Sequence, residues 1–599
     1  MKPVIEILEE RISNIMAEVS GQEKCSAIVR QATDPKFGDY QVNGVMALAK
    51  QIKTNPRKLA EKVVEKHDIG DICEDPEIAG PGFINLRLKP EFIADSLLEI
   101  NKDSKGLAIE KTAKPKNIVV DFSSPNIAKQ MHVGHLRSTI IGDCICRMFE
   151  SLGHNVIRQN HIGDWGTQFG MLCAYFDQKY LRSEGEKRTG QKDLSLLSNE
   201  VNISDMEDFY RQARLLFDSD PEFNRISKEN VVKLHNKDEH IMSVWRHIVE
   251  QSISHCQDLY DELEVTLKEN DVRGESEYND DLPRVVEELK SKGLAIESDG
   301  AVCVFPEGFK NKEREPLPFI IQKSDGAYLY ATTDLAAIRY RVNELKADEI
   351  IYVTDSRQKL HFEMLFAVAR KAGWAGDNIE LIHVTFGSIL GDDGTPLKTR
   401  SGENVKLKAL LDEAVERAKA VVERKNPELS QKQKNKIAQA VGIGAVKYAD
   451  YFNNRTSDYV FSFDKMLAME GNTAPYMQYA YARIKSIERK AQSKDVDIQT
   501  ELEGIDALNL NDASELDLSK HLIHYGEAIQ AAVSDFRPNY LTSYLYELAQ
   551  KFSTFYTNCP VLKAKPEQRP TRLLLCDLTA KTIRHGLTRL LGIDVVEQM

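Results

Sequence analysis

The middle of the chain alternates short apolar runs with longer amphipathic segments. The apolar runs predict buried strands at residues 117–122, 155–160, 349–354 and 380–385. Roughly two hundred mostly polar, helical residues separate the second strand from the third, with one hairpin expected at residues 295–305. Strands that alternate with helices predict a doubly wound parallel sheet, an α/β fold, over residues 110–410, and the long gap predicts insertions in it.

The two ends of the chain follow other patterns. Residues 1–109 mix helical periodicity with short apolar runs, and a turn at residues 80–82 leads into an expected strand, so a small α+β domain is predicted. After residue 411 only helical periodicity remains, and a helical bundle is predicted for residues 411–599. Its expected helices span residues 410–423, 435–451, 474–491, 518–534, 540–556 and 573–591.

Composition agrees with a soluble protein of several domains. The 599 residues are 42% hydrophobic and 29% charged, and no apolar run reaches the length of a membrane span. The N-terminus lacks the basic start and apolar stretch of a secretory signal, so we expect a cytoplasmic protein. The nine cysteines are scattered and odd in number, which favours reduced thiols, and no chemistry is assigned to them.

The net charge of −13 argues against a uniformly nucleic-acid-binding surface, although an RNA-binding face needs only local basicity. Residues 50–62 and 563–589 are two locally basic runs. Each is a candidate RNA-binding face or an ordinary solvated helix face.

The strongest candidate for chemistry is the stretch between the first expected strand and the helix after it. Free backbone N–H groups and the helix dipole attract polyphosphate at such a turn. His132 and His135 share one helix face and can donate hydrogen bonds to phosphate, and Gly134 between them lets a base or ribose approach the backbone. Two plainer interpretations are a zinc pair, for which further ligands at the usual spacing are missing, and ordinary surface histidines.

The motif Asn126-x-x-Lys129-x-x-His132-Val133-Gly134-His135 resembles the His-x-Gly-His signature of class I aminoacyl-tRNA synthetases, in the form that arginyl-tRNA synthetases carry. Further blocks follow in the family's order at residues 164–170, 454–455 and 470–476, so the resemblance covers essentially the whole chain.

The resemblance implies a class I Rossmann-type catalytic domain, an N-terminal domain that binds the D-loop at the tRNA elbow, and a C-terminal anticodon-binding domain. It implies that ATP, with Mg²⁺, activates L-arginine as arginyl-adenylate, releasing pyrophosphate, and that the arginyl group passes to the 3′-terminal ribose of tRNA(Arg). It also implies a cytoplasmic monomer without a resident metal site.

For the phosphates, the resemblance assigns charge stabilisation to His132 and His135, helped by Lys129. Gly134 joins these histidines in the ATP site, and Phe386 and Gly387 are expected at the adenine. The family's Lys-Met-Ser-Lys motif is replaced by Pro396-Leu397-Lys398-Thr399, which loses both lysine positions. Lys398 and Lys129 are therefore candidates for the pyrophosphate contact, unless both are ordinary solvated charges.

A guanidinium with five donors requires acceptors at fixed angles, carboxylates above all. Tyr330, at the end of a strand-like run, and Asp334, at an expected helix start, are predicted to line the arginine side-chain site, and Gln358 follows a strand at the same sheet edge. By resemblance Asn126 holds the amino-acid backbone, and Glu275 is a weaker candidate. Helix capping is the alternative for Asp334, and surface charge is the alternative for Glu275.

Aromatic residues pose the same choice between binding and packing. Phe37 and Tyr40 are expected either to stack on a tRNA base or to pack in the core of the small domain. The loop at residues 161–166 is expected to shape the amino-acid and ribose pocket, unless its Trp165 is only core.

Two other functions compete. The altered second motif favours a non-catalytic RNA-binding homologue, which the intact Asn126, His132, His135, Asp334 and Gln358 oppose. A class I synthetase for another amino acid, such as cysteine, is disfavoured because zinc-ligand spacing is absent and the expected pocket carries carboxylates.

Overall fold

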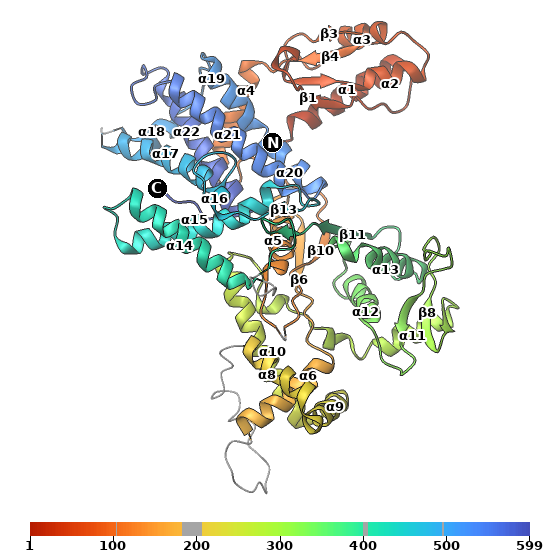
Figure 1. The fold of residues 1–599 in the computed structure, drawn as a ribbon. Coiled ribbons are helices and arrows are strands. Elements are labelled where there is room, and N and C mark those ends of the chain that lie inside the picture. The colour runs from red at the N-terminus through yellow and green to blue at the C-terminus, as the bar shows by residue number, and fades with distance from the viewer. Residues whose placement is uncertain (104, 128, 182–205, 399–404, 494–495) are drawn as a thin grey trace. The chain divides into compact units, whose positions relative to one another are not determined.

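The computed structural model describes residues 1–599 except 104, 128, 182–205, 399–404 and 494–495. The chain forms two compact units (Figure 1). One contains Met1–Ala113, Lys419–Phe452 and Met466–Met599, and the other contains Lys114–Ala418 and Asn453–Lys465.

The second unit is built on a parallel sheet with the strand order β11-β10-β5-β6. Its strands are the four that the apolar runs predict, and they occupy β5 (Asn117–Asp121), β6 (Asn155–Gln159), β10 (Glu349–Asp355) and β11 (Glu380–Phe386). Ile118, Val119 and Val120 are fully buried, which explains the unbroken apolar run of a strand covered on both faces. The loops at the carboxyl ends of β5, β6, β10 and β11 carry most of the candidate site residues.

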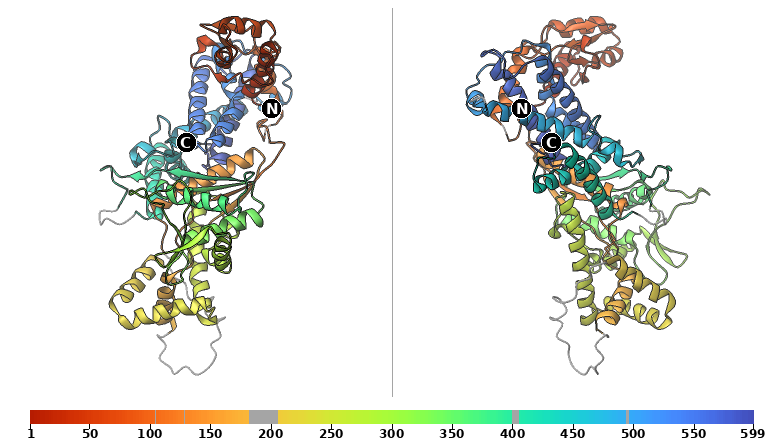
Figure 2. Two further views of the ribbon diagram at one scale, coloured as in Figure 1. Left: turned by 90° about the vertical axis from the view of Figure 1, so that its right-hand side faces the viewer. Right: turned by 60° about the vertical axis from the view of Figure 1, so that its left-hand side comes forward.

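The expected insertions consist of two packed groups. The first is helical and contains α6 (Thr167–Phe176), α8 (Met206–Ser219), α9 (Pro221–His235) and α10 (Glu239–Glu262), which share one apolar core. These helices, coloured from orange through yellow to yellow-green, stay together in both views of Figure 2.

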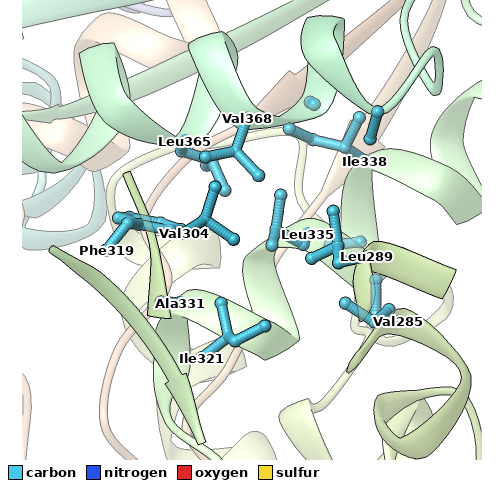
Figure 3. Packing of buried hydrophobic residues seen from close by; sticks show 14 of the residues in the cluster. Val285, Leu289, Val304, Phe319, Ile321, Ala331, Leu335, Ile338, Leu365 and Val368 are labelled. Carbon is cyan, nitrogen blue, oxygen red and sulfur yellow. The ribbon is translucent and has the colours of Figure 1, made fainter. Parts of the chain in front are cut away.

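The second group packs helices against a small antiparallel sheet. The predicted hairpin is confirmed as β7 (Ala295–Ser298) and β8 (Ala301–Val304), and β9 (Phe319–Gln322) adds a third strand. Its core contains side chains of α11 (Leu282–Ser291), α12 (Tyr330–Asn343) and α13 (Lys359–Lys371). Figure 3 shows this packing, with Leu335 and Ile338 of α12 beside Leu365 and Val368 of α13.

The first unit begins with the predicted α+β domain. Its antiparallel sheet has the order β1-β2-β4-β3, with β1 at Val29–Gln31, β2 at Tyr40–Val42, β3 at Glu77–Ala79 and β4 at Phe83–Leu86. Gly80 and Gly82 turn β3 into β4 with φ values of 53° and 147°, where glycine is favoured. The helices of this region are α1 (Val4–Ser20), α2 (Gly44–Gln51), α3 (Pro56–Glu65) and α4 (Pro90–Lys102).

The C-terminal region is helical, as predicted. Its elements are α14 (Leu407–Lys425), α15 (Gln431–Phe452), α16 (Phe463–Met466), α17 (Ala474–Gln492), α18 (Ile498–Glu503), α19 (Ala513–Ile523), α20 (Tyr525–Ser534), α21 (Pro538–Asn558) and α22 (Arg569–Arg584). The helix expected at residues 518–534 is divided into α19 and α20 at His524. Within the described residues, none of the helices is long and apolar enough to cross a membrane.

One segment of this region belongs elsewhere. Asn453–Lys465 is part of the second unit, where its strand β13 (Tyr459–Val460) pairs with β12 (Ile389–Leu390). A domain boundary at residue 411, drawn from helical periodicity alone, does not account for this segment of the second unit.

Candidate active site

The turn after β5 is the phosphate-site candidate, and its backbone is unusual. Ser123 and Ser124 have positive φ values of 69° and 46°, a backbone conformation that residues other than glycine rarely adopt. Neighbouring groups hold it: the Ser138 hydroxyl accepts from the Ser123 N–H at 2.9 Å, and the Asn160 side chain accepts from the Ser124 N–H at 3.1 Å. A strained turn is therefore maintained where the chain enters the signature motif.

Two histidines cap the helix that follows, α5 (Val133–Ser151). His132 is the N-cap residue, and its Nδ1 accepts from the Gly134 N–H at 3.1 Å. His135 Nδ1 accepts from the His132 N–H at 3.1 Å, so the two imidazoles form a reciprocal capping box. Because both Nδ1 atoms accept, each neutral ring carries its proton on Nε2 and presents an Nε2–H donor.

The surroundings keep both rings neutral. Burial and then the Lys129 charge lower the pKa of His132. Burial, followed by the neighbouring His132, lowers the pKa of His135 to about 4. The ring centroids are 4.1 Å apart. The pair therefore offers two neutral donors to phosphate oxygens, and it leaves Nδ1 of neither ring free for a metal.

Gly134 has a second reason to be glycine. An added Cβ there would lie 2.8 Å from the His132 ring, so a side chain would push that ring out of place. The nearby Lys129 is exposed, and its ammonium lies 5.0 Å from the centroid of the Tyr210 ring on α8. It is anchored by a cation–π contact close to the signature loop.

The loop after β6 lies beside the signature loop. Asn126 forms a parallel bridge with Gly163, and its side-chain oxygen accepts from Gln168 Nε2 at 3.3 Å. Trp165 packs edge-on against Trp245 with ring centroids 5.7 Å apart, so it belongs to the core of the helical insertion, the plainer of its two interpretations.

Glu275 is placed by this same loop. Its N–H donates to the Ile162 carbonyl at 3.1 Å, and the next residue, Ser276, donates its N–H and hydroxyl to Asp164 at 2.9 Å and 2.6 Å. Gly274 makes the approach possible, because a Cβ on it would lie 2.1 Å from the Asp164 carboxylate. Glu275 is half-buried rather than an exposed surface charge.

Tyr330 and Asp334 lie on one face of α12, one turn apart. The strand expected before Tyr330 is wrong, because Leu329 is the N-cap of α12 and Tyr330 is its first residue. The helix start expected at Asp334 is wrong for the same reason: Asp334 lies beyond the first turn, and its Oδ2 is 2.6 Å from His361 Nε2. Asp334 therefore does not act as a cap.

The charge of Asp334 acts on Glu275. Burial, then the charges of Asp334 and Asp164, raises the pKa of Glu275 to about 7. Such a cluster of acids costs free energy until a cation enters, and a guanidinium is the cation that two carboxylates fit. Gln358 is exposed at the end of the short helical turn after β10, and Tyr330 is 65% exposed, so both are open to a ligand.

The adenine candidates follow β11. Phe386 is buried, and the Gly387 N–H donates to the Arg455 carbonyl at 2.9 Å, so this N–H is not available to a purine. Contact with the backbone at Gly387 would have to use another group. The Ser457 backbone passes close to Gly387, and an added Cβ would lie 2.7 Å from the Ser457 carbonyl. This close approach explains why residue 387 is a glycine.

The loop that carries Pro396-Leu397-Lys398-Thr399 is described only in part. Residues 390–396 form a tight hairpin in which the Gly391 N–H donates to the Thr395 carbonyl at 2.8 Å, and Lys398 is exposed beyond it. Thr399 of this motif lies outside the described residues, as do residues 400–404 after it. After them, the Val133 N–H donates to the Val405 carbonyl at 2.9 Å, which joins this part of the chain to the signature.

Comparisons with known proteins assign the chain to a family. Residues 98–463 match the family described as tRNA synthetases class I (R), catalytic domain. Residues 6–88 match the arginyl tRNA synthetase N terminal domain, and residues 477–599 match the DALR anticodon binding domain. The chain belongs to the arginyl-tRNA synthetase family.

Relatives span the whole chain. The arginine–tRNA ligase of Chromobacterium violaceum is 49% identical over 99% of both chains, and that of Nostoc punctiforme is 50% identical over 96% of this chain and 95% of its own. Among solved structures, the arginyl-tRNA synthetase of Plasmodium falciparum is 32% identical with a TM-score of 0.83, and each chain is fully covered. The enzyme of Thermus thermophilus, at 23% identity and a TM-score of 0.79 over both whole chains, supports the fold.

Phe37 and Tyr40, the aromatic candidates of the N-terminal synthetase domain, differ in their exposure to solvent. Tyr40 is fully buried, and its hydroxyl donates to Glu527 at 2.7 Å, so its ring offers no face to a base. Its expected role in tRNA stacking is wrong, and the packing alternative holds. Phe37 is half-exposed, with Lys36 Nζ 4.7 Å from its ring centroid, and it stays a candidate.

Sequence reasoning missed Arg137, which links the signature helix to the adenine side. This side chain of α5 is 1% exposed, its guanidinium lies 5.7 Å from the Phe386 ring and 5.3 Å from the Tyr459 ring, and Nη1 donates to the Ser457 carbonyl at 3.1 Å. An arginine within an apolar helix was the only sequence signal for it.

Proposed function

We propose that this chain attaches L-arginine to tRNA(Arg) in two steps at one site. ATP, as its magnesium complex, activates arginine, and a terminal ribose hydroxyl of the tRNA then accepts the arginyl group. The observation that carries this proposal is the half-buried Glu275, whose pKa is raised to about 7 by burial and then by the charges of Asp334 and Asp164, in the unit that also presents the two neutral imidazoles. That combination suits a cationic amino acid and a triphosphate.

In the first step an oxygen of the arginine carboxylate forms a bond to the α-phosphorus of ATP. The bond between the α-phosphorus and the oxygen that bridges it to the β-phosphorus breaks. Pyrophosphate leaves with that electron pair, its charge held by the magnesium ion of the ATP complex. His132 and His135 donate Nε2–H to phosphate oxygens as their charge grows, without needing to lose a proton. Lys129 and Lys398 supply the cations for pyrophosphate.

In the second step the ribose hydroxyl attacks the carbonyl carbon of arginyl-adenylate, and AMP leaves. The chain's part is positioning rather than covalent catalysis. Glu275, Asp334 and Tyr330 hold the side chain of arginine, Gln358 adds a polar contact, and Asn126 holds its backbone.

A cavity of about 540 Å³ in the helical region is lined by Lys436, Arg489 and Arg584, together with residues of the C-terminal tail that include Asp594 and Glu597. Its three cations suit contact with tRNA phosphates, so we assign the anticodon arm to it. Tyr481 also lines the cavity, but it is 2% exposed and its ring offers no face to a base. Phe37 is the candidate contact for the tRNA elbow, and we place the enzyme in the cytoplasm as a monomer, as the family resemblance implies.

The test is arginine-dependent ATP–pyrophosphate exchange, run with and without tRNA(Arg). Exchange in the presence of tRNA supports the proposal, and exchange without tRNA means that Lys129 and Lys398 suffice by themselves. RNA binding without exchange in either condition contradicts it and favours a non-catalytic RNA-binding homologue. Exchange driven by cysteine instead of arginine contradicts the assignment of the amino acid.

A further inference from the structure

His361 joins two candidate arginine contacts at once. Its Nε2 lies 2.6 Å from Asp334 Oδ2, and its ring centroid lies 5.2 Å from that of Tyr330. The His361 and Asp334 side chains are 18% and 19% exposed, so the pair lies at the wall of the site, neither in the core nor on open surface. The two residues come from different helices, α13 and α12.

The surroundings of His361 leave its ring little freedom. Besides Tyr330, it contacts Phe319 and Phe362, with ring centroids 5.6 Å and 5.3 Å away. The helices that carry the pair share the core of Figure 3, which fixes the distance between their backbones. The contact with Asp334 is thus set by packing on several sides.

An aspartate needs such support to recognise a guanidinium. Rotation about χ2 of aspartate is loosely restrained, whereas a planar guanidinium demands a carboxylate in one plane. A donor that holds one oxygen fixes that plane and directs the other oxygen toward the ligand. Glu275 repels Asp334, which makes an unsupported carboxylate turn away.

We propose that His361 is a positioning residue for arginine: it holds Asp334 by Oδ2, so that Oδ1 receives the guanidinium, and it supports the Tyr330 ring beside it. This inference rests on the proposed role of Asp334 in arginine binding. It makes His361 a determinant of specificity for a cationic side chain, although the imidazole need not touch arginine.

Four single variants and one double variant test the inference by steady-state exchange in the presence of tRNA(Arg). His361→Phe keeps a ring against Phe319 and Tyr330 but removes the donor. His361→Gln restores an N–H donor near the place of Nε2, and His361→Asn has an amide too short to reach Asp334. Asp334→Asn is the reference variant.

We expect His361→Phe and His361→Asn to raise the arginine KM by about tenfold to a hundredfold, as for loss of a hydrogen bond to a charged group. His361→Gln should recover most of the loss. The ATP KM and the Tm should stay close to wild type. Discrimination against citrulline, a neutral isostere of arginine, should fall in the same order as arginine affinity.

The outcomes separate the two proposals. An unchanged arginine KM in Asp334→Asn removes the role of Asp334 itself. A raised KM in Asp334→Asn with unchanged values in His361→Asn and His361→Phe overturns the positioning role alone. The double variant His361→Asn/Asp334→Asn should bind arginine no worse than Asp334→Asn, and additive losses would also overturn the inference.

Discussion

The proposed phosphate side and the proposed arginine side of this site are built in opposite ways. The phosphate side lies within one turn of chain, where His132 and His135 cap α5 and each other through backbone hydrogen bonds. The arginine side collects Glu275, Asp334 and Gln358 from three separate elements. One presents neutral donors and the other presents carboxylates, so charge complementarity for each proposed substrate arises from different structural means.

The difference teaches what each side contributes. Neutral donors gain strength as phosphate charge develops, so they act on rate. A carboxylate cluster is stabilised as soon as a cation binds, so it acts on affinity. Variants on the two sides should therefore separate into changes in kcat and changes in the arginine KM.

The largest effect is expected from His135→Ala. Loss of its Nε2–H donor should lower kcat of exchange by about tenfold to a thousandfold, with the arginine KM unchanged. The capping bond is lost as well, at a cost of about 1 kcal/mol in stability. His135→Asn is the matched control, because asparagine Oδ1 takes the place of the accepting Nδ1 and its amide is too short to put a donor at the place of Nε2. Full activity in His135→Asn would remove His135 from the chemistry.

Glu275→Gln should raise the arginine KM at pH 8 by about tenfold to a hundredfold. In the wild type Glu275 has a pKa of about 7, so its protonation at lower pH weakens binding of a cation. The arginine KM should therefore fall as the pH rises through about 7, and this dependence should be absent in Glu275→Gln. A wild-type profile without that step contradicts a raised pKa.

The same shift has the opposite sign for folding without ligand. The pKa of Glu275 rises from 4.5 to about 7 in the folded chain, so between these values the native state binds more protons than the unfolded state. Stability of the free enzyme should fall as the pH rises across this window, and saturating arginine should remove the loss. Thermal melting of wild type and Glu275→Gln measures both.

Gly274→Ala should be the next largest change. A Cβ at this position meets the Asp164 carboxylate at 2.1 Å, so Asp164 or Glu275 must move, and we expect a raised arginine KM with a loss of about 1–3 kcal/mol in stability. Gly163→Ala is the matched control in the same loop region. Its Cβ would meet Asn126 at an ordinary 3.7 Å, and equal effects in both variants would refute the steric account.

The smallest effect concerns acid stability on the phosphate side. His135 has its pKa lowered from 6.5 to about 4, so between these values the unfolded chain binds the proton and the folded chain does not. His135 should therefore contribute a loss of stability as the pH falls through this window. In His135→Gln the decline should be shallower, and an identical decline in thermal melting would contradict the buried, neutral ring.

The same contrast explains what sequence reasoning could find. The signature histidines and the four parallel strands follow local rules of spacing, burial and helix capping, so they were predictable. The tautomers of the histidines follow from the capping bonds, which spacing alone does not reveal. The family resemblance suggested Asp334, and Glu275 as a weaker candidate, but not their electrostatic coupling, which depends on burial.

Tertiary contacts decided the remaining features. Tyr330 ends an alternating aromatic run, yet it begins α12, because that helix packs on the core shared with α11 and α13. Tyr40 looked like an exposed aromatic beside a glycine, but Glu527, which is distant in sequence, accepts its hydroxyl proton. His361 and Arg137 had no motif to mark them, since their partners are on other elements.

The most direct test of the division between the two sides is the arginine Kd measured by calorimetry in the absence of ATP for His135→Gln and Asp334→Asn. We predict that His135→Gln binds arginine as tightly as the wild type does, whereas Asp334→Asn binds it at least about tenfold more weakly. An equal loss of affinity in both variants would contradict the account, because the imidazole would then act on arginine binding and not only on the phosphates.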